Sequence, residues 1–334
     1  MTTIENISVQ SISCAVPKQH FSILEYAPNL LDEKTAKRMS KKTGFTSLRV
    51  APDNMTTADL VACAAEPILH DIDRSDIKAL VFVSQTPDHI VPATSHILQD
   101  RLGLSNETLC IDVQEGCSGY VTGLFLSAML AKQFDGAVLL AAGDTSTKIS
   151  SNPNDRATRC IFGDAGTVSL IAPTDGGGLM RFAFEGYGDR FDAIIRDNSA
   201  GRRVHNPRND GYTHMDGVAI MDFSLDEVPA CIEKFLADNQ LSKDDVSLYA
   251  CHQANKLILR SLADKLGVPH DKMPFTSGDI GNESSASIPL VLTHCADSDR
   301  LERVLCCGFG VGLAIAVCLT DFSNTKFYGV FELE

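Results

Sequence analysis

Three side chains in this sequence have the chemistry needed to carry an acyl group and to stabilise the negative charge that forms when it reacts. Cys117 follows a short apolar segment, His252 follows an apolar run, and Asn282 follows a glycine. A cysteine thiolate can hold an acyl group as a thioester. A histidine can move a proton, and an asparagine amide can donate to an oxyanion. Together they predict acyl transfer through sulfur, followed by stabilisation of an enolate or a tetrahedral intermediate.

The surroundings of Cys117 favour a reactive thiol. Residues 109–113 are predicted to form a strand, and a long helix is expected to begin near Cys117. The positive end of a helix dipole favours a thiolate, and the small neighbours Gly116 and Gly119 leave room for a substrate. A buried structural cysteine is the alternative interpretation, because cysteine is often buried and this chain has 11.

The other two candidates also have structural explanations. A histidine at the end of a strand often serves packing alone, and an asparagine after a glycine is most often a turn residue. Residues 308–312 (GFGVG) resemble a nucleotide-binding glycine loop. They are predicted to form a turn that leads into a strand and not into a helix, so we reject nucleotide binding there.

Apolar segments predict the strands that would position these side chains. Residues 77–84, 136–142, 246–251 and 303–307 are continuous apolar runs of the kind found in strands buried on both faces. The order of elements in the first half of the chain returns in the second, which predicts an internal duplication joined near residues 173–178.

The expected fold is therefore α/β, made of two related halves. The N-terminal half, residues 1–173, carries Cys117, and the C-terminal half, residues 174–334, carries His252 and Asn282.

Composition limits the classes of function. The net charge of −14 argues against non-specific nucleic-acid binding. The 11 cysteines are scattered, with no C-x-x-C pair, which is typical of a reducing compartment. The N-terminus lacks the pattern of a signal peptide, and no apolar run reaches transmembrane length. We expect a cytoplasmic protein with no membrane partner and no metal site.

Four short segments together closely resemble the β-ketoacyl-acyl carrier protein synthase III family of the thiolase-like superfamily. They are residues 116–120 (GCSGY), 162–166 (FGDAG), 252–255 (HQAN) and 281–289 (GNESSASIP). The last two at this spacing are highly specific, and the resemblance spans nearly the whole chain. It implies two related halves stacked as five layers, α-β-α-β-α, and a homodimer.

The resemblance also implies roles for individual residues. Cys117 would be the acylated nucleophile, while His252 and Asn282 would hold the thioester carbonyl of malonyl-acyl carrier protein as it decarboxylates. The resulting carbanion would attack acyl-Cys117. The backbone N–H groups of Cys117 and Val311 would form the oxyanion hole. Coenzyme A or phosphopantetheine thioesters would be the substrates, with no separate cofactor.

Several positions depart from the family pattern. Arg38 stands where many members have a tryptophan that stacks on coenzyme A, and Lys42 replaces an arginine, whereas Arg156 matches. The donor can therefore be a coenzyme A or a carrier thioester. Val91 matches a position, often phenylalanine, that lines the acyl pocket of the partner subunit, and Val311 replaces a usual glycine. These changes suggest a different starter group and a specialised biosynthetic pathway.

A predicted helix after His252 carries Lys256 and Arg260 one turn apart, so their side chains share a face. On a protein of charge −14 this pair could dock an acidic carrier protein. An ordinary solvated helix face is the alternative, and Leu257 stands where the family usually has an arginine.

Three other functions are alternatives to condensation. Transfer of the acyl group from Cys117 to an oxygen or nitrogen acceptor would keep the fold, but an intact Asn282 favours carbon–carbon bond formation. A cysteine hydrolase is disfavoured because its typical signature and secreted context are absent. A non-catalytic partner subunit is disfavoured because Cys117, His252 and Asn282 are all present.

Overall fold

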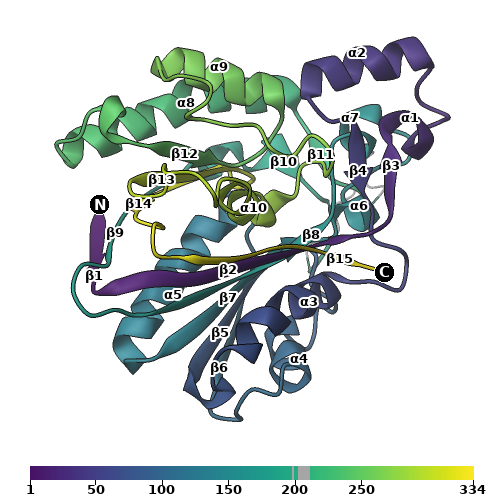
Figure 1. Ribbon diagram of the computed structural model, residues 1–334. Helices are drawn as coiled ribbons and strands as arrows, with labels where there is room; N and C mark the ends of the chain where they lie inside the picture. The colour runs from purple at the N-terminus through teal and green to yellow at the C-terminus, as the bar shows by residue number, and fades with distance from the viewer. Residues whose placement is uncertain (198, 202–210) are drawn as a thin grey trace.

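The computed structural model describes residues 1–197, 199–201 and 211–334 and has two sheets separated by a layer of helices (Figure 1). In spatial order the first sheet contains β15 (Lys326–Leu333), β2 (Ile7–Pro17), β8 (Ala165–Pro173), β7 (Ala137–Asp144), β5 (Ile77–Val83) and β6 (Leu109–Val113). The second contains β1 (Thr2–Glu5), β9 (Leu179–Gly186), β14 (Ala314–Thr320), β13 (Val304–Gly310) and β12 (Leu248–Cys251).

Helices cover both sheets and fill the space between them. The middle layer is formed by α5 (Gly119–Phe134) and α10 (Ser287–His294), which pack in one core with residues of both sheets. The outer face of the first sheet is covered by α3 (Thr57–His70) and α4 (Thr94–Arg101). The outer face of the second is covered by α8 (Gly217–Asp238) and α9 (Lys256–Leu266). This arrangement confirms the predicted five-layer α-β-α-β-α fold.

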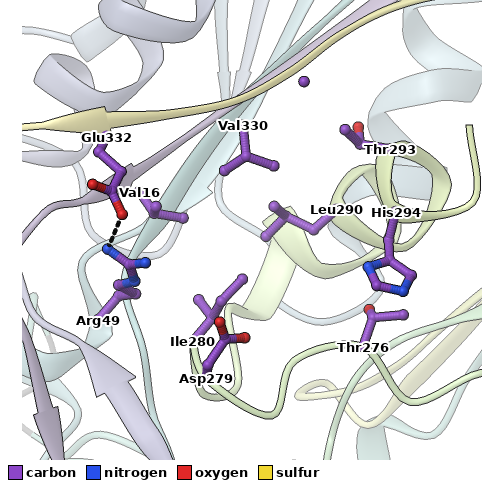
Figure 2. A pocket seen from close by; sticks show the side chains of 11 residues that line it. Val16, Arg49, Thr276, Asp279, Ile280, Leu290, Thr293, His294, Val330 and Glu332 are labelled. Atoms are coloured by element: carbon purple, nitrogen blue, oxygen red, sulfur yellow. Dashed lines mark ion pairs between the residues drawn. The ribbon is translucent and has the colours of Figure 1, made fainter.

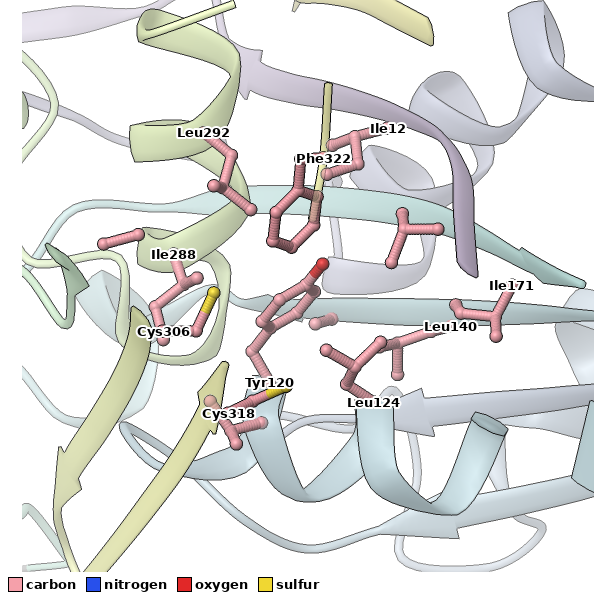
Figure 3. Packing of buried hydrophobic residues seen from close by; sticks show 14 of the residues in the cluster. Ile12, Tyr120, Leu124, Leu140, Ile171, Ile288, Leu292, Cys306, Cys318 and Phe322 are labelled. Atoms are coloured by element: carbon pink, nitrogen blue, oxygen red, sulfur yellow. The ribbon is translucent and has the colours of Figure 1, made fainter. Parts of the chain in front are cut away.

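The continuous apolar runs read from the sequence are strands in the interior of the sheets. β5 and β7 pair with each other in parallel and lie between two helical layers, so both of their faces need apolar side chains. α5 is apolar around most of its circumference for the same reason, since it contacts both sheets. Figure 3 shows Tyr120 of α5 in this core, where its hydroxyl lies 3.0 Å from the Ser169 hydroxyl.

The strand order of the first sheet is repeated in the second. β2, β8, β7 and β5 follow one another in the first sheet as β9, β14, β13 and β12 do in the second. We propose from this repeat that the halves are residues 1–173 and 174–334. Each end of the chain joins the sheet of the other half. β1, from the first half, pairs with β9, and β15, from the second half, pairs with β2.

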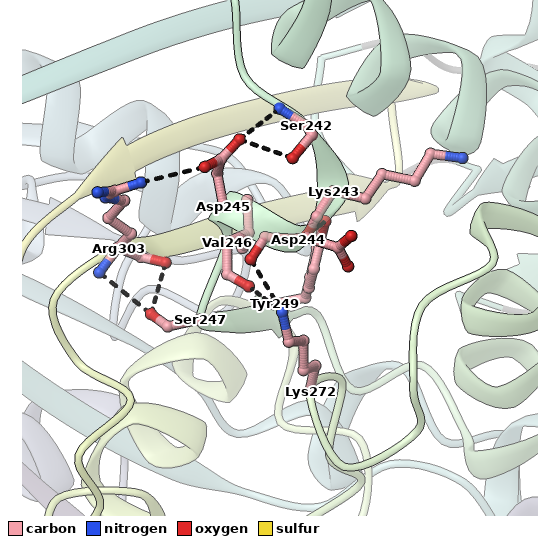
Figure 4. Close-up of polar contacts among 9 residues, drawn as sticks. All are labelled: Ser242, Lys243, Asp244, Asp245, Val246, Ser247, Tyr249, Lys272 and Arg303. Carbon is pink, nitrogen blue, oxygen red and sulfur yellow. Dashed lines mark hydrogen bonds and ion pairs between the residues drawn. The ribbon is translucent and has the colours of Figure 1, made fainter.

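Polar contacts fix the start of β12, the strand that leads to His252 (Figure 4). Asp245 accepts hydrogen bonds from the backbone N–H and the hydroxyl of Ser242, at 2.8 and 2.6 Å. The Tyr249 hydroxyl donates to the Lys243 carbonyl at 3.1 Å, and the Lys272 ammonium donates to two carbonyls of the same turn. These bonds fix the position of the first residues of β12, which is a short strand that ends directly before His252.

The helices α1 (Ile23–Tyr26), α2 (Glu33–Thr43), α6 (Ser146–Ile149) and α7 (Arg156–Arg159), together with a small sheet of β3 (His20–Ser22) and β4 (Ser47–Arg49), lie to one side of the layers (Figure 1). A further two-stranded pair joins β10 (Ile194–Ile195) to β11 (His214–Met215). In the ranges that the structure describes, no helix is long and apolar enough to cross a membrane.

Candidate active site

Cys117 lies in the turn between β6 and α5, directly under β13. Helix α5 begins at Gly119, so Cys117 precedes the helix and is not part of it. A Cβ atom on Gly308 would lie 2.7 Å from the Cys117 carbonyl oxygen, and one on Gly310 would lie 2.9 Å from the sulfur. Side chains at these two positions would collide with Cys117, so the glycines allow β13 to pass over the thiol.

The Cys117 thiol is protonated at neutral pH. Burial, with a smaller contribution from the nearby Asp144 carboxylate, raises its pKa to about 11. The backbone N–H groups of Val311 and Cys117 and the Ser284 hydroxyl lie within hydrogen-bonding reach of the sulfur and lower the pKa only in part. Loss of water around the sulfur therefore opposes the thiolate that the helix dipole was expected to favour.

His252 is buried at the end of β12. Its backbone N–H donates to the Cys307 carbonyl at 2.8 Å, and its ring meets the Phe309 ring edge-on, with centroids 5.6 Å apart. Nδ1 lies 2.8 Å from the Ser287 hydroxyl at the start of α10. Burial lowers the pKa of His252 to about 4, so the ring is neutral at physiological pH.

The rest of the HQAN segment shapes the local backbone. Gln253 is buried, donates to the Cys251 carbonyl at 2.9 Å and accepts from the Thr276 N–H at 2.9 Å. Asn255 caps α9 by accepting from the Ile258 N–H at 2.9 Å. These two side chains hold the strand end and the following helix in place around His252.

Asn282 is positioned by the FGDAG segment. Its N–H donates to the Ile161 carbonyl at 2.8 Å, and its carbonyl accepts from the Gly163 N–H at 3.1 Å. A Cβ on Gly163 would lie 1.8 Å from the Ile280 carbonyl oxygen, which explains the glycine there. The Asn282 side-chain oxygen accepts from the Ser284 N–H at 3.0 Å, so the amide nitrogen remains available as a donor.

Ser284 connects the three candidates, and the sequence analysis missed it. Its hydroxyl faces the Cys117 sulfur, its backbone bonds to His252, and its N–H bonds to Asn282. It adopts a left-handed backbone conformation, with φ of 50°, which is uncommon for a residue other than glycine. The structure therefore brings Cys117, His252 and Asn282 together around one serine, and a positive φ at a serine has no sequence signal.

Asp144 at the end of β7 was also missed. It is fully buried and accepts from Ser84, from the Gln85 N–H at 2.7 Å and from the Ser285 hydroxyl at 3.0 Å. Burial raises the pKa of Asp144, while these bonds lower it in part. Its bonds to Ser285 fix the loop that follows Asn282.

The predicted substrate-contact residues lie at the surface. Arg38 and Lys42 are exposed on α2, and Arg156 is exposed at the start of α7. Val91 is 82 % exposed in the loop after β5. The structure does not bring these four side chains into the group around Ser284.

The predicted docking residues lie at the α2–α9 junction. Lys256 and Arg260 are on α9, and Arg260 is exposed. A Cβ on Gly44, at the end of α2, would lie 2.6 Å from the Lys256 Cβ, so the two helices touch there. This contact places Lys256 and Arg260 of α9 beside the helix α2, which carries Arg38 and Lys42.

A pocket of about 470 Å³ lies elsewhere, between β4, β15 and the C-terminal end of α10 (Figure 2). It is lined by Val16, Arg49, Thr276, Asp279, Ile280, Leu290, Thr293, His294, Gly329, Val330 and Glu332. Arg49 and Glu332 form an ion pair of 2.7 Å across it. None of Cys117, His252 and Asn282 lines this pocket, so we do not assign the chemistry to it.

Among the described residues, no group of three or more His, Cys, Asp or Glu could hold a metal ion.

Glu283 is a buried carboxyl beside Asn282, and neither of its oxygens has a hydrogen-bond partner among the described residues. Burial raises its pKa from 4.5 to about 8. The folded protein therefore binds this proton more tightly than the unfolded chain does, so stability falls as pH rises from about 4.5 to 8, by on the order of 4 kcal/mol in total.

Glu283→Gln removes the titrating group and is expected to raise Tm increasingly between pH 5 and pH 8, with no further gain above that. Thermal unfolding by circular dichroism at several pH values measures the difference. Glu107→Gln, at an exposed position, is the matched control and should show no such trend. A gain in Tm that does not vary with pH would contradict the raised pKa of the Glu283 carboxyl in the folded protein.

Two family models match the chain. Residues 111–188 match 3-oxoacyl-[acyl-carrier-protein (ACP)] synthase III, and residues 236–322 match the C-terminal part of that enzyme. The first range contains Cys117, and the second contains His252 and Asn282.

Individual relatives cover most of the chain. β-Ketoacyl-[acyl-carrier-protein] synthase III of Streptococcus sanguinis is 30% identical over 285 residues, which is 82% of this chain and 87% of the relative. The enzyme of the same name from Ehrlichia canis is 29% identical over 286 residues, 84% of this chain and 88% of the relative. The solved structure of 3-oxoacyl-(acyl-carrier protein) synthase from Burkholderia xenovorans LB400 superposes with a TM-score of 0.93 at 30% identity, over 99% of this chain and 98% of that one. The chain therefore belongs to the β-ketoacyl-acyl carrier protein synthase III family of condensing acyltransferases, as its sequence motifs predicted.

Proposed function

We propose that this protein performs the decarboxylative Claisen condensation of an acyl thioester with malonyl-acyl carrier protein, through acyl-Cys117, to give a β-ketoacyl thioester. One observation supports this most strongly: the backbone N–H groups of Cys117 and Val311 both lie within reach of the Cys117 sulfur. An acyl group on that sulfur would place its carbonyl oxygen beside two fixed donors, as an oxyanion hole requires.

The reaction follows from the groups at the site. The Cys117 sulfur attacks the thioester carbon of the donor, a new carbon–sulfur bond forms, and the donor thiol leaves. The malonyl group then loses its carboxylate as CO2, and the electron pair of the broken bond becomes the enolate. Asn282 and His252 would stabilise the enolate oxygen. The enolate carbon attacks acyl-Cys117, a carbon–carbon bond forms, and the sulfur is expelled.

The proposed reaction is tested with malonyl-acyl carrier protein labelled at its free carboxyl carbon, mixed with the enzyme and a series of acyl donors. We expect one labelled CO2 for each β-ketoacyl product. Formation of acyl-Cys117 followed by transfer to an oxygen or nitrogen acceptor, with no labelled CO2, would replace condensation by the simpler acyl transfer.

We propose that the acyl donor and the extender are both bound through their phosphopantetheine arm at the cationic surface of α2 and α9, with Arg156 of α7. The two helices carry eight cations, of which Lys265 is paired with Asp226: Lys34, Lys37, Arg38, Lys41, Lys42, Lys256, Arg260 and Lys265. Lys234 and Lys243, which lie outside these two helices, are each paired with a carboxylate. A concentration of cations on a protein of charge −14 favours an acidic carrier or coenzyme A phosphates.

The double variant Lys256→Glu/Arg260→Glu is expected to raise KM for malonyl-acyl carrier protein about tenfold, with little change in kcat, because it reverses charge at the encounter surface. Steady-state kinetics at low and high salt measure this effect, which should shrink as salt rises. Lys234→Glu, at an exposed position of α8, is the matched control. An unchanged KM in the double variant would remove α9 from the docking surface.

We further propose that the protein is a homodimer that pairs the β6 edges of two copies. β6 ends the six-stranded sheet, and its first residue, Leu109, is 39 % exposed. An uncovered edge of this kind is a template for a further strand. Ile90 and Val91 follow the adjacent strand β5 and are also exposed, so they would reach toward the partner.

Light scattering of the purified protein should give the mass of two chains, and Leu109→Lys should shift it toward one. A monomer at all concentrations would rule out this interface.

We also propose a cytoplasmic location, since all 11 cysteines are free thiols and free thiols persist in reducing compartments.

A further inference from the structure

The strand β15 contains a bulge beside the pocket of Figure 2. The pairing of β15 with β2 shifts register between Phe327 and Val330. Gly329 lies in this bulge with φ of 91°, and a Cβ atom on it would meet nothing within 4 Å. A bulge bends its strand locally, and the absent side chain of Gly329 leaves space open in the wall of the pocket. At about 470 Å³ the pocket has room for a small organic molecule.

Arg49 presents hydrogen-bond donors without partners to this pocket. Its Nη1 donates to the Pro17 and Lys18 carbonyls at 3.1 and 3.3 Å and pairs with Glu332 at 2.7 Å. Its Nε is buried and has no hydrogen-bond partner among the described residues. Nε and Nη2 of an arginine form a planar edge that binds a carboxylate through two parallel hydrogen bonds. In Figure 2 this edge lies on the side of the guanidinium away from Glu332, so it is open to a carboxylate in the pocket.

A negative charge lies on the same wall. Asp279 is exposed, lines the pocket and forms no ion pair within the part of the chain that the structure describes. The carbonyl of its neighbour Ile280 accepts the Arg49 N–H at 2.8 Å, so Asp279 and Arg49 lie on adjacent segments (Figure 2). Since Glu332 is already paired with Arg49, Asp279 gives the pocket an excess negative charge.

These charges discriminate between classes of ligand. A simple carboxylic acid would be repelled by the Asp279 carboxylate. A simple amine would leave the Nε donor of Arg49 buried without a partner. A molecule that carries both a carboxylate and an ammonium group satisfies both residues.

The remaining wall favours an apolar group on that molecule. Val16, Ile280, Leu290 and Val330 line the pocket. Val330 is 46 % exposed, and an apolar side chain placed against it would remove this surface from water.

We propose that this pocket binds a small zwitterion with an apolar side chain, of the α-amino-acid class. Its carboxylate would accept from the open edge of Arg49, and its ammonium would pair with Asp279. Its side chain would lie against Leu290 and Val330. This binding goes beyond the proposed function, because none of the three candidate catalytic residues lines the pocket. β15 and β6 are opposite edges of the first sheet, so the proposed dimer leaves the pocket accessible.

The pocket adjoins the segment that carries Asn282. Ile280 lines the pocket, its carbonyl is bonded to the Arg49 N–H, and Asn282 follows two residues later. A ligand that joins Arg49 to Asp279 would add a second connection between these two segments. Occupation of the pocket would therefore restrain residues 279–282.

Isothermal titration calorimetry of the full chain with L-leucine, L-valine and L-phenylalanine tests the site. We expect at least one of them to bind, at one site per chain. Two analogues of leucine separate the charges, because 4-methylpentanoate lacks the ammonium and 3-methylbutylamine lacks the carboxylate. Each should bind about tenfold more weakly than leucine or worse, since each loses one contact to a charged group. Equal affinity for either analogue would overturn the zwitterion, and no binding of any amino acid would overturn the site.

Variants place the ligand in this pocket. Asp279→Asn changes an exposed side chain and should weaken binding about tenfold. Asp299→Asn, at an exposed position in the turn after α10, is the matched control and should bind as the wild type does. Arg49→Lys keeps the charge but removes the planar edge, so it should also bind weakly, with its folding checked by Tm. Unchanged affinity in Asp279→Asn would overturn the placement.

Amide hydrogen exchange tests the restraint on the segment of Asn282. With the bound amino acid we expect exchange at Gly281 and Asn282 to slow about threefold or more, because opening of the segment would break the contacts to the ligand. Unchanged exchange in a protein that binds the amino acid would overturn the restraint. These measurements use no thioester, so failure of Cys117 to accept an acyl group would overturn the proposed function and leave this site standing.

Discussion

Asn282→Ala is expected to lower the rate of condensation about 10²- to 10³-fold while Cys117 still accepts an acyl group. The Asn282 amide oxygen is held by the Ser284 N–H, which leaves the amide nitrogen as a donor. Removing one donor from a developing oxyanion typically costs this much in kcat. The loss should fall on the half-reaction that forms the enolate, because the acyl oxyanion would have the backbone N–H groups of Cys117 and Val311 as its donors.

Separate measurement of the two half-reactions checks this division. Acylation is followed by intact mass, and condensation is started by adding malonyl-acyl carrier protein to enzyme acylated beforehand. Asn239→Ala is the matched control, since Asn239 closes the distant end of α8 through a bond to the Phe235 carbonyl. Equal losses in both half-reactions of Asn282→Ala would show that Asn282 supports the site as a whole and does not act on the enolate.

Gly310→Ala is expected to reduce activity about 100-fold or more. The added Cβ would lie 2.8 Å from the Cys117 Cβ and 2.9 Å from its sulfur, both closer than real contacts allow. Gly310 also has φ of 151°, a conformation that other residues rarely adopt. Relief of the clash must move the sulfur or the Val311 N–H, and a displacement near 1 Å can cost about 10²-fold in rate.

The matched control for this variant is Gly186→Ala in β9, where an added Cβ meets nothing within 4 Å. Both proteins are compared by Tm and by the rate of Cys117 acylation. Normal acylation in a folded Gly310→Ala protein would mean that β13 does not lie over the thiol as described.

The strands of both sheets could be predicted because burial on two faces leaves a continuous apolar run. β5 and β7 show this, and so does β13, although β13 extends to Gly310 where a turn was predicted from residue 308. Glycines 308 and 310 suggested a turn, yet they are needed for the passage of β13 over Cys117. The reason for each glycine lies about 190 residues away in the sequence, so no local pattern could give it.

Positions of Cys117, His252 and Asn282 at element ends were also predictable, since each follows an apolar segment or a glycine. The groups that organise them were not. Ser284 reaches its partners because its backbone adopts a left-handed conformation, which the sequence does not indicate. Asp144 is bonded to Gln85 and Ser285, which are distant from it and from each other in the chain. The exchange of β1 and β15 between the sheets likewise depends on pairing between opposite ends of the chain.

Intact-protein mass spectrometry shows directly whether Cys117 carries the acyl group. The protein is incubated with a panel of acyl-coenzyme A and acyl-carrier donors, beside Cys117→Ala. We expect a single acyl adduct on the wild type, none on Cys117→Ala, and loss of the adduct when malonyl-acyl carrier protein is added. An adduct that persists in Cys117→Ala, or no adduct from any donor, would contradict the assignment of Cys117 as the acyl carrier.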